Sequence, residues 1–275
     1  MLKTRVLTAL ALFAGLIAAM FLLPPLGWLV LAALICSGAA WEWAGFGKFS
    51  STQRAIFAIL LGAACLLVGM TAGLARELTA APAGLWPLYL TSALFWLAVV
   101  PFWLARKWRF GGAAATVAVG LVVLLPPALA LAHLRLVDPW ILLAAMGAIF
   151  VSDIAAYFTG RAFGRRKLAP GISPGKTWEG AGGAVVGVIV FGLVVITASI
   201  PAARAAAPIA LFIPLLAGFT TVGIFGDLFE SLLKRQAGLK DSGTILPGHG
   251  GILDRIDSLT STLPLVGLAA LWLTR

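Results

Sequence analysis

The sequence predicts an all-α polytopic membrane protein with about nine transmembrane helices and a cytoplasmic N-terminus. Three observations predict this fold class. The 275 residues are 61% hydrophobic and only 11% charged, whereas soluble domains are about 45–50% apolar. The apolar residues come in runs of about 20, the length that a helix needs to cross a bilayer. The basic residues collect in alternate connecting segments, as they do in multi-span proteins.

Proline, glycine and charged residues divide the chain into successive apolar runs. The first run follows Lys3 and Arg5 and resembles a signal peptide, but it is long and no small-residue cleavage site precedes Pro24–Pro25. We therefore expect an uncleaved first helix. The nine expected spans cover about residues 6–23, 26–45, 54–73, 86–105, 111–132, 139–159, 179–200, 207–232 and 257–273.

The charges support this count. If the N-terminus is cytoplasmic, the connecting segments on the inner side carry sixteen of the twenty basic residues. The outer side keeps one basic residue per segment: Arg76, Arg135, Arg204 and Arg275. A wrong number of spans would mix the two sets, so the asymmetry favours nine spans and an inner N-terminus.

The net charge of +10 indicates anionic partners. No soluble module carries a basic stripe interleaved with aromatic residues, so we expect phosphate substrates or membrane lipid head groups and no nucleic acid. In the front half, Glu42 lies between Trp41 and Trp43, which is typical of an interfacial anchor. Gly183 and Gly187 form a GxxxG pattern that would let two helices approach closely.

The acidic residues are concentrated in the second half, where seven of ten lie between Asp153 and Asp257. A carboxylate inside a span costs about 2.5–3.5 kcal/mol on insertion scales and generally faces a polar cavity. Helical spacing places these acids in two stripes that run toward the cytoplasmic face: Asp227, Ser231 and Lys234, with Glu230 and Arg235 beside them, and Asp153, Tyr157, Gly160 and Arg161. The alternative is structural pairing of Asp227 with Lys234 or Arg235, and of Asp153 with Arg161.

Two polar segments flank these stripes. Ser173, Lys176 and Thr177 belong to an expected compact turn, SPGKT, whose backbone N–H groups and hydroxyls could cradle phosphate, although the spacing of a Walker A loop is absent. Arg165–Lys167 are expected to be an ordinary basic loop. The second segment, Lys240–Asp257, has glycines around His249 that allow close backbone approach to a ligand.

The donor types favour Mg²⁺ over zinc. Two carboxylates from separate helices, completed by phosphate oxygens and water, suit Mg²⁺. Two histidines, His133 and His249, cannot assemble a zinc cluster. Asp257 alone has a second interpretation as an ordinary helix N-cap.

The run from Ser231 to Asp257 resembles the signature of the phosphatidate cytidylyltransferases. It contains S-x-x-K-R-x-x-x-x-K-D, H-G-G and D-R-x-D at that family's spacing. Asp153–Arg161 and the ISPGKTWEG segment resemble the family's upstream motifs. The motifs cover roughly the last 120 residues, and the front half matches only as a hydrophobic multi-span segment.

The resemblance implies Mg²⁺-dependent conversion of CTP and phosphatidic acid to CDP-diacylglycerol and pyrophosphate, by a homodimer in a bacterial inner membrane with its active site facing the cytoplasm. Residues 1–132 would form the scaffold of a single domain, 1–275, and 139–275 its catalytic part. Asp227 and Asp254 would bind the metal, with a second cation such as K⁺ beside it. The expected catalytic residues are Asp227, Asp254, Lys234, Lys240 and His249. The expected substrate-binding residues are Asp153, Tyr157, Arg161, Ser173, Lys176, Thr177, Ser231, Arg235, Asp241, Arg255 and Asp257.

Three other functions also fit acids among membrane spans. A polyprenyl-phosphate sugar-1-phosphate transferase and a lipid kinase both pair acids with Mg²⁺. A cation or phosphate transporter would also place Asp153 and Asp227 within spans. Transporters usually contain inverted repeats and broken helices at mid-membrane, whereas the charges here gather at one face.

Overall fold

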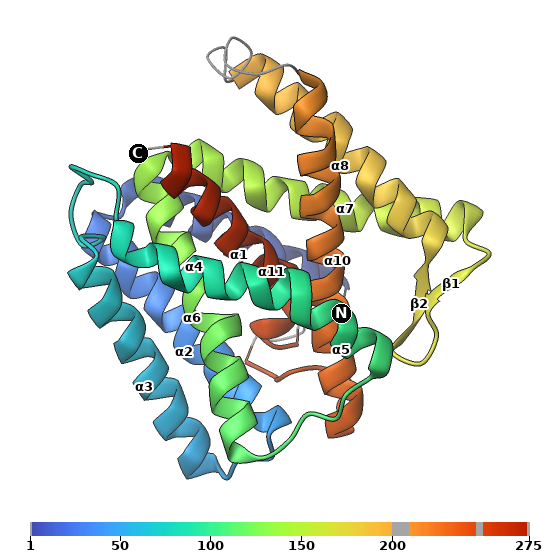
Figure 1. Ribbon diagram of the computed structural model, residues 1–275, viewed down its shortest axis with the longest axis horizontal. Helices are drawn as coiled ribbons and strands as arrows, with labels where there is room; N and C mark the ends of the chain where they lie inside the picture. The colour runs from blue at the N-terminus through green and yellow to red at the C-terminus, as the bar shows by residue number, and fades with distance from the viewer. Residues whose placement is uncertain (1, 200–208, 246–249, 274–275) are drawn as a thin grey trace.

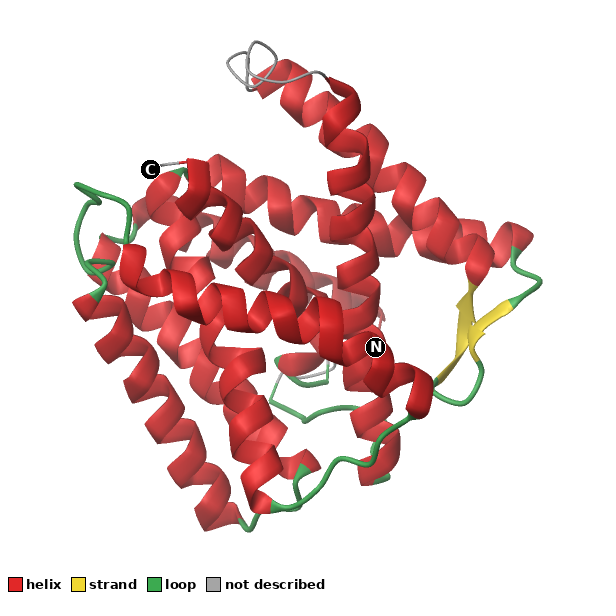
Figure 2. Cartoon of the chain, viewed as in Figure 1, coloured by secondary structure: helices red, strands yellow, loops and turns green. Residues whose placement is uncertain are grey.

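The protein is a bundle of long helices with one small hairpin, shown in Figures 1 and 2. The computed structural model describes residues 2–199, 209–245 and 250–273. Within these ranges the helices are α1 (Leu2–Leu22), α2 (Pro25–Phe46), α3 (Ser51–Thr71), α4 (Trp86–Leu94), α5 (Val100–Arg106), α6 (Ala113–Val137), α7 (Pro139–Phe163), α8 (Trp178–Ser199), α10 (Phe212–Ala237) and α11 (Leu253–Leu273). A 3-10 turn, a π-helical turn and a second 3-10 turn lie at Ala83–Leu85, Phe95–Val99 and Ile209–Leu211.

The predicted spans coincide with these helices. Eight helical stretches in the described part of the chain are long and apolar enough to cross a membrane, with Ala83–Arg106 counted as one stretch. The first predicted span coincides with α1, within which Phe13–Leu22 is a shorter apolar stretch. The fold class, an all-α polytopic membrane protein, is therefore confirmed.

The core lies among α2, α6 and α11, and indole groups tie the first two together. Trp28 Nε1 donates to the Leu131 carbonyl at 3.0 Å, and Trp43 Nε1 donates to the Thr116 carbonyl at 2.9 Å. Both indoles are buried, so each needs an acceptor inside the protein. These bonds fix α2 along α6 and give the second half of the chain a rigid surface to pack on.

The SPGKT segment is not the compact turn that the sequence predicted. Ser173–Thr177 forms strand β2, which pairs antiparallel with β1, Lys167–Ala169. The turn lies between the strands instead, where the Ile172 N–H bonds the Ala169 carbonyl at 3.0 Å. The backbone of the segment is thus partly used by strand pairing, and Lys176 is carried on an extended strand.

Helices α7 and α8 pack closely through small residues, as the GxxxG pattern predicted. A Cβ added to Gly183 would lie 2.1 Å from Thr159 Oγ1, and one added to Gly187 would lie 2.8 Å from Ala155 Cβ. Gly180 meets α7 in the same way, at the Ala156 carbonyl. The absence of side chains on this face of α8 lets the two helices approach closely.

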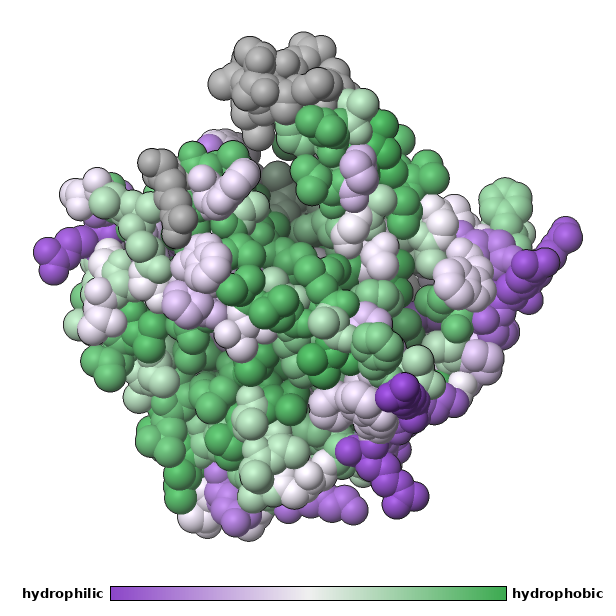
Figure 3. Space-filling view, viewed as in Figure 1, coloured by the Kyte–Doolittle hydropathy of each residue, from purple (hydrophilic) through white to green (hydrophobic). Residues whose placement is uncertain are grey.

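Several segments that the charge pattern assigned to the inner side lie together. The Phe110 N–H and the Trp108 carbonyl bond the side chain of Gln236 at 2.8 and 2.9 Å, which ties the α5–α6 connection to the end of α10. A Cβ on Gly171, in the hairpin turn, would lie 2.7 Å from Lys107 Nζ. Figure 3 shows hydrophilic residues along the lower and right edges of the molecule, a smaller group at its left edge, and a largely apolar surface between them.

We expect Gly183→Ala to lower the free energy of unfolding by about 1–3 kcal/mol, because the added methyl group overpacks the α7–α8 contact. Gly182→Ala is the matched control, since no atom lies within 4 Å of a Cβ at that position, and helix propensity favours alanine there. Thermal unfolding of both purified variants in the same detergent measures the difference. Equal stabilities would contradict the close packing of these helices.

Candidate functional site

A cavity of about 480 Å³ with charged residues in its wall opens among α7, the hairpin, α8, α10 and α11. Six of the residues that the sequence predicted to bind substrate or metal line it, together with small residues that leave it room. Those six are Asp153, Tyr157, Arg161, Lys176, Thr177 and Asp227. The structure therefore brings together residues separated by up to 74 positions in the sequence, from three different motifs.

Asp227 is the carboxylate of α10 that faces this cavity. It forms an ion pair with Lys176 of β2, and the two side chains are each 28% exposed. Ser231 Oγ, one helical turn further along α10, donates to Asp227 Oδ1 at 3.4 Å. The suggested structural pairing of Asp227 with Lys234 or Arg235 is not what the structure shows, because the partner comes from the hairpin.

The α7 stripe forms the facing wall. Asp153, Tyr157, Gly160 and Arg161 all line the cavity, as their spacing predicted. Arg161 Nη1 donates to the Tyr157 hydroxyl at 3.0 Å. Thr177 is buried at the base of the wall, where its Oγ1 accepts the Gly180 N–H at 3.1 Å and caps α8. That hydroxyl therefore fixes where the hairpin ends and the helix begins.

A second cluster lies further along α10, centred on Lys234. Its Nζ is 2.6 Å from Asp254 Oδ1 and 3.0 Å from Glu230 Oε1. All three side chains are largely buried, with exposed fractions of 13%, 9% and 5% for Lys234, Asp254 and Glu230. Asp254 Oδ2 also accepts the N–H groups of Ser242 and Gly251, each at 2.9 Å, so its orientation is fixed from three sides.

Asp257 connects the two clusters. Its carboxylate is repelled by Asp227 and Asp153 and attracted by Lys176 on the cavity side, and it is repelled by Glu230 on the other. The N-cap interpretation of Asp257 is excluded, because α11 already begins at Leu253. The start of α11 thus carries two acids, Asp254 and Asp257, one in each polar region.

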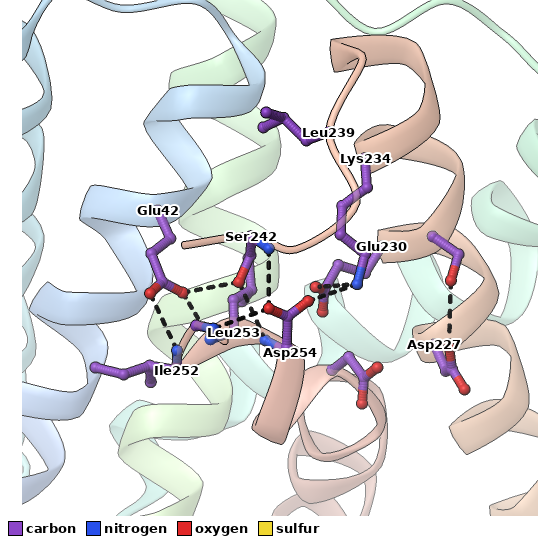
Figure 4. A network of polar contacts seen from close by, with 12 residues as sticks. Glu42, Asp227, Glu230, Lys234, Leu239, Ser242, Ile252, Leu253 and Asp254 are labelled. Carbon is purple, nitrogen blue, oxygen red and sulfur yellow. Dashed lines mark hydrogen bonds and ion pairs between the residues drawn. The ribbon is translucent and has the colours of Figure 1, made fainter. Parts of the chain in front are cut away.

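Glu42 is a site residue whose role the sequence analysis missed. The expected interfacial anchor is completely buried, with an exposed fraction of 0%. Its carboxylate accepts bonds from the Ser242 hydroxyl at 2.9 Å, the Ile252 N–H at 3.1 Å and the Leu253 N–H at 2.9 Å (Figure 4). An available signal was that Glu42 is an acid within an apolar span, which generally has a partner inside the protein.

The remaining predicted residues lie around these clusters. Gly250 has φ +81°, a left-handed backbone conformation that favours glycine. Gly251 lies so close to Glu42 that a Cβ added to it would be 2.4 Å from Glu42 Oε2. Ser173 pairs with Ala169 in the hairpin. Arg235, Lys240, Asp241 and Arg255 are exposed around the α10–α11 connection. His249 lies outside the described residues.

The basic segment before the hairpin has a structural role that the sequence left unspecified. Glu179 accepts the backbone N–H groups of Arg165 at 3.1 Å and Arg166 at 3.2 Å. Because Glu179 lies in the first turn of α8, these bonds close the base of the hairpin against that helix. Lys176 is therefore presented to Asp227 by a hairpin held at both strands.

We expect Lys234→Met to lower the free energy of unfolding by about 3–5 kcal/mol, because it leaves buried carboxylates without their cation. Arg235→Met, at the exposed neighbouring position, should change stability by no more than about 0.5 kcal/mol. Denaturation of both variants in the same detergent gives the comparison. Similar stabilities for the two would show that the Glu230–Lys234–Asp254 contacts contribute little.

Comparison with known proteins covers the whole site and its scaffold. The Cytidylyltransferase family matches residues 3–272. A phosphatidate cytidylyltransferase of Pseudomonas aeruginosa is 36% identical over 280 residues, which is 99% of this chain and 97% of the relative. Proteins of the same name from Haemophilus influenzae and Brucella suis are 34% and 36% identical, over 96% and 97% of this chain and 96% and 92% of theirs. The predicted resemblance is confirmed, and the chain belongs to the cytidylyltransferase family.

Proposed function

We propose that the chain transfers the cytidylyl group of CTP to phosphatidic acid, releasing pyrophosphate and forming CDP-diacylglycerol. The observation that carries the proposal is the cavity where Lys176, Asp227 and the α7 stripe meet, at the polar end of an apolar bundle. A phosphorylated lipid can reach such a position from the membrane, and a nucleotide can reach it from water. Relatives that match nearly the full chain carry the corresponding name.

The chemistry is a displacement at phosphorus. A phosphate oxygen of phosphatidic acid forms a bond to the α-phosphorus of CTP, and the bond from that phosphorus to the bridging oxygen of the β-phosphate breaks. The phosphomonoester has a second pKa of about 6, so it is largely dianionic at neutral pH and needs no strong base. The protein's contribution is alignment and charge neutralisation. Lys176 and Arg161 line the cavity, where they would neutralise phosphate charge. We assign Lys234, Arg235 and Lys240 to substrate phosphate groups that extend outside the cavity.

The residues present suit Mg²⁺. Carboxylates from α7, α10 and α11 surround the same polar region, and oxygen donors are what this ion prefers. Within residues 2–199, 209–245 and 250–273, no three His, Cys, Asp or Glu side chains form a ready-made metal site. We propose that Asp227 and Asp254, with Asp257 close by, hold Mg²⁺ once Asp254 Oδ1 exchanges its contact with Lys234 for the ion, and that a second cation such as K⁺ binds beside it. Bound Mg²⁺ would neutralise charge on the α-phosphate and the leaving pyrophosphate.

The placement of the enzyme follows from the charge pattern. We propose a bacterial inner membrane location with the N-terminus and the cavity on the cytoplasmic side, where CTP is available. The support is that sixteen of the twenty basic residues fall in the segments assigned to that side. A homodimer is proposed from the family resemblance alone.

Label transfer tests the activity. With the purified protein, Mg²⁺ and phosphatidic acid, we expect label from α-³²P-CTP to enter chloroform-soluble lipid, while label from γ-³²P-CTP leaves as pyrophosphate. A lipid kinase would transfer the γ label, and a sugar-1-phosphate transferase would require a UDP-sugar. Ion flux in proteoliposomes without labelled lipid would instead support a transporter.

Asp227→Asn and Lys176→Met should each reduce turnover by about 10²- to 10³-fold, the range seen when one group that stabilises developing charge is removed. Arg165→Gln is the control, because that side chain is exposed at the base of the hairpin and should keep turnover near that of the wild type. Initial rates with saturating CTP and phosphatidic acid are the measurement. Near-normal turnover of Asp227→Asn would overturn the assignment of this carboxylate.

A further inference from the structure

We propose that Glu42 is a positioning residue for the cytidylyl transfer, holding Asp254 and the backbone that precedes it from the opposite half of the chain. The kinetic part of this inference rests on the proposed function. Glu42 lies in α2, about 200 residues before the segments it contacts. Its side chain does not touch the cavity, so it would act through other residues.

A short chain of hydrogen bonds leads from Glu42 to Asp254. The Ser242 hydroxyl donates to Glu42 Oε2 at 2.9 Å and accepts the Asp254 N–H at 3.3 Å. The Ser242 N–H in turn donates to Asp254 Oδ2 at 2.9 Å. Figure 4 shows the two carboxylates on either side of Ser242. One serine therefore separates Glu42 from the carboxylate that pairs with Lys234.

Glu42 also caps α11 from outside that helix. The first N–H groups of a helix have no acceptor within it, and α11 begins at Leu253. Glu42 accepts the N–H groups of Ile252 and Leu253 at 3.1 and 2.9 Å. A carboxylate at this end also interacts favourably with the helix dipole. Glu42 of α2 therefore fixes the position of α11 along its axis. It thereby also fixes where Asp254 and Asp257 lie along that axis.

The steric fit around Glu42 is close. A Cβ added to Gly243 or Gly251 would lie 2.4 Å from a Glu42 oxygen, and one added to Gly38 would lie 2.5 Å from Ile252 Cδ1. Two segments of the α10–α11 connection therefore press against one carboxylate, and α2 has no side chain at Gly38 to hold them away. A glutamine could not replace this group without loss, because its NH₂ would face an N–H or hydroxyl donor.

The test compares Glu42→Gln and Ser242→Ala with Ser37→Ala. Ser37 lies on the same helix and makes one scaffold bond, to the Ala58 carbonyl at 2.9 Å, so it controls for loss of a hydrogen bond in α2. We expect Glu42→Gln to lower kcat by about 10- to 100-fold with KM for CTP little changed. Ser242→Ala should lower kcat in the same direction, and Ser37→Ala should not.

Two further measurements separate positioning from general stability. Amide hydrogen exchange at Ile252 and Leu253 should accelerate in Glu42→Gln, while exchange in α3 stays at the wild-type rate. The Glu42→Gln/Ser242→Ala double variant should have the same kcat as Glu42→Gln alone, because both changes break the same chain of hydrogen bonds. If kcat falls only as the folded fraction falls, with exchange rising in every helix, the residue is merely structural and the inference is overturned.

Normal kcat in folded Glu42→Gln would also overturn it. If that variant does not fold, Ser242→Ala decides, because it leaves Glu42 and its two backbone bonds intact, and normal kcat there contradicts the inference. Failure of the proposed function has a different signature, since the wild type itself would transfer no label. The exchange measurements would then still show whether Glu42 holds the start of α11.

Discussion

The structure depends on the cost of placing carboxylates in an apolar bundle. A charge removed from water is tolerated only where cations or N–H groups replace its hydration. Three acids meet this requirement in different ways. Asp227 has Lys176, Asp254 has Lys234 and two backbone N–H groups, and Glu42 has one hydroxyl and two N–H groups. The hairpin and the α10–α11 connection run where they can supply these cations and N–H groups.

These partnerships join segments that are far apart in the sequence. Lys176 connects the hairpin to α10, and Lys234 connects α10 to α11. Glu42 connects the N-terminal helices to the backbone that precedes Asp254. The front half is therefore more than a support for the catalytic helices. It contributes a buried carboxylate to the polar end of the bundle, and its indole bonds from α2 to α6 keep that group in place.

Periodicity and charge were enough to predict the helices, because a span needs a run of about 20 apolar residues and little else. Spacing on one helix also predicted the α7 stripe and the side-by-side placement of Asp227 and Ser231. Pairing across helices was not predictable, since it depends on how they pack. Lys176 as the partner of Asp227, and Asp254 as the partner of Lys234, are of this kind. The hairpin was missed because SPGKT contains proline and glycine, which favour turns. Glu42 was misread because its flanking tryptophans matched an interfacial pattern.

The glycine face of α8 ties the shape of the cavity to helix packing. Gly180, Gly183 and Gly187 lie directly against α7, and the hairpin that carries Lys176 leads straight into the first turn of α8. The distance between these two helices therefore also sets where Lys176 stands relative to Asp227. Glycines that look like simple packing residues thus determine the geometry of an ion pair on the opposite wall of the cavity.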